Sequence, residues 1–573
     1  MLPSTDSSTP PPSRNNLRRW GPIVAIVAVI AVVAVAVALS GGGGDDDDQA
    51  TTSGTNGGAA AAGATGAISW SKAKADNVKV TFPDTCDTKT GRVKLPYFYA
   101  AECYADLPAG TDNGGATSTG VTADSIKVVV YLRQQGDPVY DFITAAIKNN
   151  DTNAQYIDTL RGYFDMFQSL YQTYGRKVDV SYVEGSGGAL DEVAARADAA
   201  KIIAMKPFAV LGGPALTTAF ADELTANKVI SIGALGGSLP SWYEQRAPYA
   251  YSVVANTQQG YAMAAEYIGK KVAGHPAKFA GDSSMQSKER RFGLLYLESN
   301  EDSRTTADQF EKDLKAKYDV DIAAKVGYVL DPAKLQEQAD SAIARLKQAN
   351  VTSVIFTGDP VAPGTFTRQA TAQNWFPEWI LGNTALADTT AFARSYDQKQ
   401  WAHAFGISTT VAARTKPEDA ANWKLFEWFK GTPPPAKDSA GVLLPGPSIL
   451  FSGLQAAGPN LTPETFRDGL FSIQVRSGAV TNQAFSYGKR GYWPYDDYNG
   501  IDDMTEIWWD PSASGPDEIR KQGQGMYRYV DGGTRYFVGK IPATETRAFD
   551  PAGSVTLYEE PPAAEKVPDY PRP

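Results

Sequence analysis

The sequence has few of the residues on which catalysis and metal binding most often depend. Its 573 residues include two histidines, His275 and His403, and two cysteines, Cys86 and Cys103. Neither histidine lies in a pattern that suits a Ser-His-Asp triad or a metal cluster. The formal net charge is −10. Because no basic stripe is present to neutralise phosphates, the composition argues against binding of nucleic acid.

Motifs of several enzyme classes are also missing. No G-x-S-x-G nucleophile elbow occurs. The glycines of Gly185-Ser186-Gly187-Gly188 follow a strand pattern, but Leu190 replaces the third glycine of a dinucleotide-binding loop. The aspartates around Asn499-Gly500 do not have the spacing of an EF-hand loop. We therefore expect a protein that is not an enzyme and that holds neither a cofactor nor a metal.

The N-terminal region contains an uncharged apolar run from residue 22 to residue 39, preceded by arginines at positions 14, 18 and 19. As a helix this run spans roughly 27 Å, enough for the hydrocarbon core of a bilayer. The arginines predict a cytoplasmic tail over 1–20 and an extracytoplasmic location for the rest. The run is either an uncleaved transmembrane signal anchor over 21–40, which its length favours, or a cleaved signal that uses Ala36-Val37-Ala38.

The region after the apolar run contains both cysteines. Residues 41–69 are rich in Gly, Asp and Ala and are typical of a flexible linker. Residues 70–120 then form an N-terminal extension. Because this part of the chain is predicted to lie outside the cell, where oxidation is permitted, we expect Cys86 and Cys103 to form a disulfide that staples the extension.

The main body alternates between apolar strand patterns and amphipathic helix patterns. One clear unit is PFAVLGGPALTTAFADELTANKVISIGALGG, at 207–237, which predicts strand, helix and strand. Unbroken apolar strands joined by helices imply a parallel sheet that is covered on both faces. The same alternation starts again at Arg291. The sequence therefore predicts two Rossmann-like α/β lobes with a ligand crevice beyond the carboxyl ends of their strands.

Four segments, in order along the chain, carry a resemblance to a known family. GVTADSIKVVV, YFDMFQSLYQTYGRKVDVSYVEG, PYAYSVVANTQQGYAMAAEYI and LTPETFRDGL resemble the branched-chain amino-acid-binding (Leu/Ile/Val) family of ABC-transporter receptors, which has the type I periplasmic-binding-protein fold. The resemblance implies a three-segment hinge and the following parts: lobe one at 120–254 plus 385–475, lobe two at 256–383 plus 480–545, and a loose Pro-rich tail at 546–573.

The resemblance also implies a ligand site at the ends of the strands. The implied ligand-binding residues are Arg133, Gln134, Ala215, Thr217, Thr218, Ala234, Leu235, Asn300, Asp359 and Asn383. The sequence departs from the family's amino-acid pattern in two places. Asn383 stands where an acidic residue usually binds the ligand ammonium, and Asn300-Glu301-Asp302 stand where an aromatic residue is expected after the first strand of lobe two. Asp359 either takes over the ammonium or forms a helix-start turn. Arg133 either binds an anion or is a surface charge.

The resemblance implies a solute-binding protein of an ABC importer at the cell membrane, single-pass with its bulk extracytoplasmic, or secreted if the signal is cleaved. It would capture an amino acid, an amide or a short carboxylate between two closing lobes. Its partners would be the small solute, the permease and ATPase subunits, and the membrane through the N-terminal helix. The alternative is a membrane-anchored sensor or scaffold that uses the same fold without a transporter.

Overall fold

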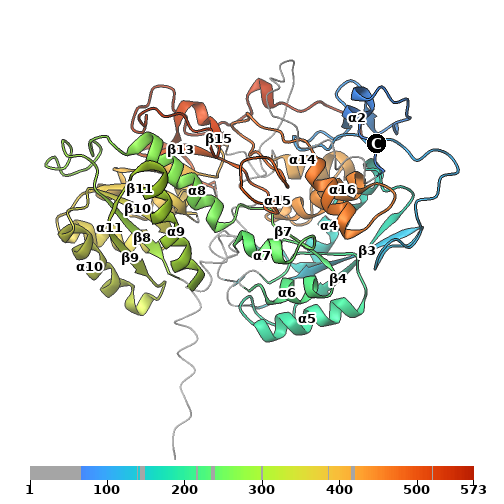
Figure 1. Ribbon diagram of the computed structural model, residues 1–573, viewed down its shortest axis with the longest axis horizontal. Coiled ribbons are helices and arrows are strands. Elements are labelled where there is room, and N and C mark those ends of the chain that lie inside the picture. Colours follow the sequence, from blue (N-terminus) through green and yellow to red (C-terminus); the bar gives the residue numbers. More distant parts are fainter. Residues whose placement is uncertain are drawn as a thin grey trace, which may run out of the picture.

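The protein contains two α/β lobes, each built around its own sheet (Figure 1). The predicted segments 1–20 and 21–40 and most of the linker 41–69 lie outside the described residues. The side chains of Glu301, Pro332 and Asn383 are also outside the description. The computed structural model describes residues 66–137, 140–141, 149–214, 217–233, 239–298, 301–384, 386–413, 418, 420–518 and 520–573.

The sheet of lobe one has five parallel strands in the order β4-β3-β5-β6-β7. Alternate residues of β3 enter different cores. Val128 and Val130 pack with α4, whereas Val129 and Tyr131 pack with α5 and α6, so both faces of the sheet are covered. The elements are β3 (Ser125–Leu132), α4 (Asn153–Leu170), β4 (Lys177–Glu184), α5 (Glu192–Ala204), β5 (Ala209–Leu211), α6 (Ala219–Ala226), β6 (Ile230–Ile232), α7 (Pro240–Gln245) and β7 (Ala250–Tyr251).

The sheet of lobe two begins with five parallel strands in the order β9-β8-β10-β11-β12, and antiparallel strands extend it beyond β12. The parallel part and its helices are α8 (Thr257–Tyr267), a π-helical turn (Ile268–Val272), β8 (Phe292–Leu297), α9 (Glu301–Tyr318), β9 (Ile322–Tyr328), α10 (Pro332–Gln348), β10 (Ser353–Gly358), α11 (Ala362–Ala372), β11 (Glu378–Thr384), α12 (Thr390–Ala393), α13 (Gln398–Trp401) and β12 (Ala404–Ser408). The antiparallel part is β13 (Asp503–Pro516), β14 (Gln522–Tyr529), a 3-10 turn (Val530–Gly533) and β15 (Arg535–Phe537).

Four further helices return to lobe one, where three of them contact α4 directly. They are α14 (Ala421–Lys430), α15 (Ala440–Leu443), α16 (Pro445–Ala457) and α17 (Pro463–Ser472). Among the described residues, Ala440–Ala457 is the one helical stretch long and apolar enough to cross a membrane, and 72% of it is buried inside the protein. Since its apolar side chains pack in the core of lobe one, we interpret it as a core helix.

The chain returns to lobe one later than predicted. Trp401, Ala404 and Ala412 are buried in the core of lobe two, and β12 pairs with β11. The assignment of 385–475 to lobe one is therefore wrong for its first part. The physical reason is that the five residues of β12 are all buried, so they are stable only as an added strand of the second sheet.

The last crossing between the lobes also comes later than predicted. Tyr487 and Tyr498 still belong to the core of lobe one, and β13 is the next element of lobe two. The start of lobe two at 480 is therefore wrong. At this crossing Ser252 forms a bridge with Asn499, and the Asn499 side chain accepts a hydrogen bond from Asn256 at 3.0 Å. These polar contacts join two crossing segments of the hinge.

The C-terminal segment is attached to the rest of the protein, which corrects the prediction of a loose tail at 546–573. The buried Glu565 accepts hydrogen bonds from the backbone of Val480 and Thr481. Tyr570 accepts a bond from the Trp428 indole at 2.7 Å and donates its hydroxyl to Asp87 at 2.9 Å. The C-terminus consequently lies on lobe one, near Asp87 and Trp428 (Figure 1). A short helix, α2 (Trp70–Ala75), begins the described extension, and a 3-10 turn (Ala563–Glu565) precedes the C-terminus.

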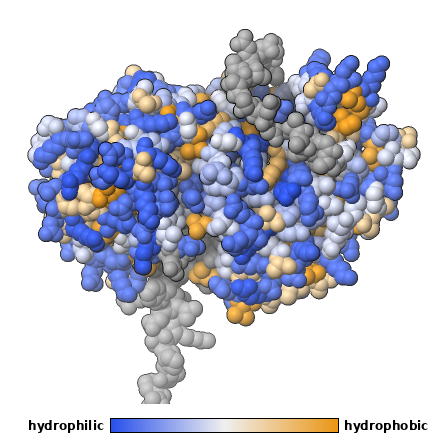
Figure 2. All heavy atoms as spheres, viewed as in Figure 1, coloured by the Kyte–Doolittle hydropathy of each residue, from blue (hydrophilic) through white to orange (hydrophobic). Residues whose placement is uncertain are grey.

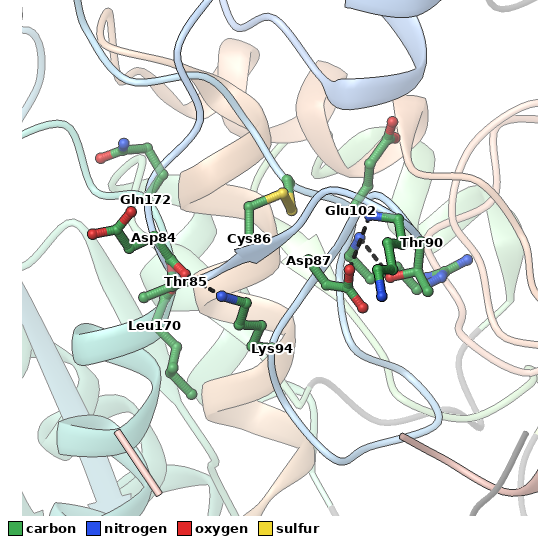
Figure 3. Close-up of a disulfide and its surroundings, with 12 residues drawn as sticks. Asp84, Thr85, Cys86, Asp87, Thr90, Lys94, Glu102, Leu170 and Gln172 are labelled. Atoms are coloured by element: carbon green, nitrogen blue, oxygen red, sulfur yellow. Dashed lines mark hydrogen bonds between the residues drawn. A yellow bond between two sulfur atoms is a disulfide. The ribbon is translucent and has the colours of Figure 1, made fainter. Parts of the chain in front are cut away.

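The disulfide predicted between Cys86 and Cys103 is confirmed. It joins the short strand β1 (Cys86–Asp87), which pairs with β2 (Arg92–Val93), to Cys103 in the middle part of the extension (Figure 3). Within the loop that the disulfide closes, Leu95 and Tyr97 are buried in the core of lobe one. The extension is therefore integrated into lobe one. The visible face of both lobes is largely hydrophilic, with hydrophobic residues in small scattered groups (Figure 2).

We expect the disulfide to stabilise lobe one. Closing a loop with a sequence separation of 17 restricts the unfolded chain and contributes about 3 kcal/mol. The double variant Cys86→Ala/Cys103→Ala avoids burying new polar groups. In urea unfolding, the midpoint of its first transition should occur at a lower urea concentration. Equal transitions in the variant and in the oxidised protein would show that the buried side chains alone hold the extension.

The pair Asp497 and Asp502 at the last crossing makes stability depend on pH. Burial raises the pKa of Asp497 to about 7 and raises that of Asp502, and Asp497 also repels the charged form of Asp502. An acid with a raised pKa in the folded state binds its proton more tightly there than in the unfolded chain. Its stabilising contribution is complete below the unfolded pKa of about 4 and is lost as the pH rises through about 7.

We expect Asp497→Asn to remove much of this dependence. The difference in Tm between variant and unmodified protein should grow in favour of the variant from pH 5 to pH 8, because the amide carries no charge to bury. Thermal unfolding followed by circular dichroism measures this difference. The matched variant Asp179→Asn, at an exposed position of β4, should show little change across the same range. A constant difference for Asp497→Asn would contradict the prediction.

Candidate functional site

The order of the strands marks one edge of each sheet as a site. In lobe one the chain passes from β3 to β4 on one side and then to β5 on the other side of β3. In lobe two it passes from β8 to β9 and then to β10 on the other side of β8. Loops leaving such a central strand and its second neighbour diverge and open a crevice at the carboxyl ends of the strands, where ligands bind. By this rule we expect one crevice after β3 and β5 and another after β8 and β10.

Two glycines leave the backbone accessible at the carboxyl ends of β5 and β6 in lobe one. Gly212 follows β5 with φ +81°, and a Cβ there would lie 3.0 Å from the backbone oxygen of Tyr131. Gly233 follows β6 with φ +104°, and its Cβ would lie 3.5 Å from Gly212. Both positions have positive φ, and Gly212 also has little space, so a side chain is disfavoured at either. A small molecule can therefore approach the backbone at this edge.

Thr217 and Thr218 lie at the start of α6, as predicted. The buried Thr217 hydroxyl oxygen accepts a hydrogen bond from the Ala219 amide at 3.1 Å, which leaves its hydrogen able to donate. Thr218 donates to Asp222 at 3.0 Å. Asp222 also forms an ion pair with Arg246 at 2.7 Å. Thr218 is thus held in a polar network on α6, and Thr217 is the better placed of the two to bind a ligand.

Arg133 supplies a positive charge at the edge of lobe one. Its guanidinium lies 5.7 Å from the ring centre of Tyr140 and 5.6 Å from that of Tyr156, and its Nη2 donates to the backbone oxygen of Asp151 at 3.2 Å. The side chain is half-buried, as is that of the neighbouring Gln134. Since a guanidinium has five N–H donors, Arg133 retains donors for an anionic ligand.

Glu298 supplies a carboxylate at the edge of lobe two, directly after β8. It accepts a hydrogen bond from the Tyr296 hydroxyl at 2.9 Å and from Arg304 Nε at 3.1 Å. The hydrogen bonds from Arg304 lower the pKa of Glu298, so the group is ionised at neutral pH. Glu298 is not among the predicted ligand-binding residues, although its position directly after an apolar strand is a local sequence signal of a ligand site.

Asp359 does not face the crevice, and its predicted role as a ligand acceptor is withdrawn. The residue is fully buried. One carboxylate oxygen accepts the amides of Val361 at 2.7 Å and Ala362 at 2.9 Å, and the other accepts the Tyr328 hydroxyl at 2.5 Å. Burial raises the pKa of this carboxyl. An aspartate just before a helix binds the first free amides, which agrees with the alternative interpretation as a helix-start turn.

Five of the predicted ligand-binding residues cannot be compared with the structure. Ala215, Ala234, Leu235 and Asn300 lie outside the described residues. For Asn383, the backbone belongs to β11 and the side chain lies outside the description. Among the described residues, Arg133 and Gln134 follow β3, and Thr217 and Thr218 precede the first residue of α6. Their role in ligand binding stays a prediction.

Two doubly wound lobes, linked by crossing segments and each with polar side chains at its switch point, define a two-lobed binding protein. Sequence comparison identifies its family. The model of the periplasmic binding protein family matches residues 148–493, more than half of the 573 residues. The chain therefore belongs to the periplasmic binding protein family, and the resemblance seen in the sequence is confirmed.

Solved structures of low sequence identity are also similar to parts of this chain. The solute-binding protein of an ABC transporter from R. palustris, with 4-hydroxybenzoate, is 12% identical over 70% of this chain and 97% of its own, with a TM-score of 0.43. LivJ from Streptococcus pneumoniae, with isoleucine, is 14% identical over 71% and 100%, with a TM-score of 0.43. A substrate-binding protein from Sphaerobacter thermophilus is 14% identical over 73% and 100%, with a TM-score of 0.48. No protein of curated function matches the chain.

We expect Tyr328→Phe to destabilise lobe two more than Tyr261→Phe does. The first change leaves a fully buried carboxylate oxygen of Asp359 without its donor and should cost about 1.5–3 kcal/mol. The second removes a neutral bond between Tyr261 and Thr357, 2.9 Å long, and should cost about 1 kcal/mol. Urea unfolding of the two variants provides the comparison. Equal losses would contradict the internal role assigned to Asp359.

Proposed function

We propose that this protein is the solute-binding component of an ABC importer and captures a small polar solute between its two lobes. The observation that carries the proposal is the match of residues 148–493 to the periplasmic binding protein family. The strand order supports it, because each lobe has its switch point at the carboxyl ends of its central strands. Closure of the lobes would bring the two crevices together around the solute.

The charges at the two edges favour a solute with a carboxylate and a hydrogen-bond donor. Arg133 and the Thr217 hydroxyl in lobe one are suited to a carboxylate, which a guanidinium binds with paired N–H donors. Glu298 in lobe two is suited to an ammonium or amide group. An α-amino acid satisfies both edges, and a short carboxylate or an amide satisfies one of them. In this proposal Glu298 supplies the carboxylate for the ligand ammonium, in place of the acidic residue that the family has at the position of Asn383.

In this proposal the two lobes lie outside the cytoplasmic membrane, and the apolar segment at 21–40 anchors them to it. The disulfide between Cys86 and Cys103 supports this location, since disulfides persist in oxidising compartments. The partners in this arrangement are permease and ATPase subunits. In this role the protein is a receptor without enzymatic activity, and the residues of the crevice determine which solute it binds.

Thermal unfolding of the full chain against a solute panel tests this function. The panel contains the common amino acids, amides, short carboxylates, sugars and 4-hydroxybenzoate; isoleucine and 4-hydroxybenzoate are included because the similar structures named above contain them. A bound solute at about one hundred times its Kd should add about 2.7 kcal/mol to the stability and raise Tm.

Matched variants locate the binding site. Arg133→Gln and Glu298→Gln should each lose the shift of Tm, because each removes a charge that the solute contacts. Arg161→Gln removes an exposed positive charge from α4 of the same lobe and should keep the shift. No shift with any member of the panel, or an equal loss in Arg161→Gln, would contradict the proposed site.

A further inference from the structure

A second cavity lies outside the crevice, between the disulfide-linked extension and the helices of lobe one. Its volume is about 160 Å³. The walls come from three parts of the chain: residues 70–102 of the extension, helix α16, and the segment from Leu470 to Tyr487 that leads toward the last crossing. Arg133, Thr217 and Glu298 are not among the described residues that line it. The cavity is therefore separate from the proposed solute site.

Most of the wall is aromatic or aliphatic. The rings of Tyr97 and Tyr99 lie 5.4 Å apart, and that of Phe485 lies 6.3 Å from Tyr99. Ile449 of α16 and Leu470 of α17 add aliphatic side chains to the wall. An apolar cavity of about 150 Å³ in another protein holds benzene. The space here thus suits a body of about the size of one benzene ring.

The charged residues that line the cavity, within the described part of the chain, are Arg92, Arg476 and Glu102. Two positive charges against one negative charge leave the wall with an excess positive charge. Glu102 accepts a hydrogen bond from the Ser71 amide at 2.5 Å and lies close enough to Arg92 to interact with its charge. Among the charged groups around Arg476, Arg92 has the largest effect on its pKa and lowers it, while the carboxylate of Glu565 acts in the opposite direction.

Each of the two arginine side chains donates one hydrogen bond to a backbone oxygen. Arg92 donates from Nη1 to the oxygen of Ala100 at 2.8 Å. Arg476 donates from Nη1 to the oxygen of Phe98, and its guanidinium lies 4.1 Å from the centre of the Phe98 ring. Burial and the nearby charge of Arg92 lower the pKa of Arg476 to about 10, so it remains positive at neutral pH. Each guanidinium has further N–H donors for a ligand.

The extension fixes the wall that carries Arg92. The disulfide closes the loop that contains β2, and Thr90 and Glu102 lie on the side of the disulfide away from Leu170 (Figure 3). Gly91 has φ +73°, and a Cβ there would lie 2.4 Å from the ring of Trp70. The wall is therefore closely packed and keeps Arg92 at a fixed position, which is what a preformed site requires.

We propose that this cavity binds a monocarboxylate with an apolar body about the size of a benzene ring. The carboxylate lies between Arg92 and Arg476, where it compensates the excess positive charge, and the apolar body lies among Tyr97, Tyr99 and Phe485. The site is independent of the proposed solute crevice, so binding there does not require that the protein serve an importer.

Ligand-observed ¹⁹F NMR on the full chain in lipid nanodiscs tests this site, with 4-fluorobenzoate as the probe. The probe should bind, and the neutral 4-fluorobenzamide of equal size should not. Arg476→Gln should weaken binding of the probe at least about tenfold, the effect of losing a hydrogen bond to a charged group. Arg467→Gln removes a positive charge from α17, where Arg467 pairs with Asp468, and should leave the affinity unchanged.

Two additional variants separate the possible outcomes. Thr217→Ala affects the solute crevice and should leave binding of the probe unchanged, whereas loss of binding there would assign the probe to the crevice and overturn the proposal. Ser448→Leu fills the cavity from α16 and should abolish binding; it decides the question if Arg476→Gln does not fold. Failure of the unmodified protein to bind 4-fluorobenzoate, or binding that survives Ser448→Leu, would also overturn the proposal.

Discussion

The pairing of each central strand with neighbours on both sides is the constraint on which the rest of the structure depends. β3 pairs with β4 on one side and β5 on the other, and β8 does the same with β9 and β10. Parallel pairing forces helical crossovers onto both faces, so both sheets are buried. It also leaves the carboxyl ends of the strands as the edge where loops diverge. The polar residues Arg133 and Glu298 belong to that edge for this reason.

The later part of the chain determines how the lobes are joined. It completes lobe two with β12 to β15, and it completes lobe one with α14 to α17. The polar contact between Asn256 and Asn499 lies where these segments cross. The C-terminal segment adds contacts of its own, because Glu565 binds the backbone at Val480 and Tyr570 contacts lobe one.

The extension changes the chemistry of lobe one as well as its stability. Residues such as Leu95 and Tyr97 enlarge the apolar core, while the disulfide restricts the loop that carries Arg92. Together with Arg476 this arginine gives an otherwise apolar cavity a positive charge. The two proposed sites therefore differ in character: the solute crevice is polar, and the small cavity is mostly apolar with two arginines in its wall.

Local sequence patterns determined the alternation of strands and helices, the repeat of that alternation in a second lobe, and the disulfide. They also placed Arg133 and Thr217 at strand ends, because an apolar run that stops at polar residues is a local signal. Three features depended on tertiary structure. β12 joined lobe two since its burial required a neighbouring strand, and Asp359 turned inward because Tyr328 and two backbone amides satisfy its oxygens. The cavity between Arg92 and Arg476 arises from segments almost 400 residues apart, and their proximity is set by packing of the whole lobe.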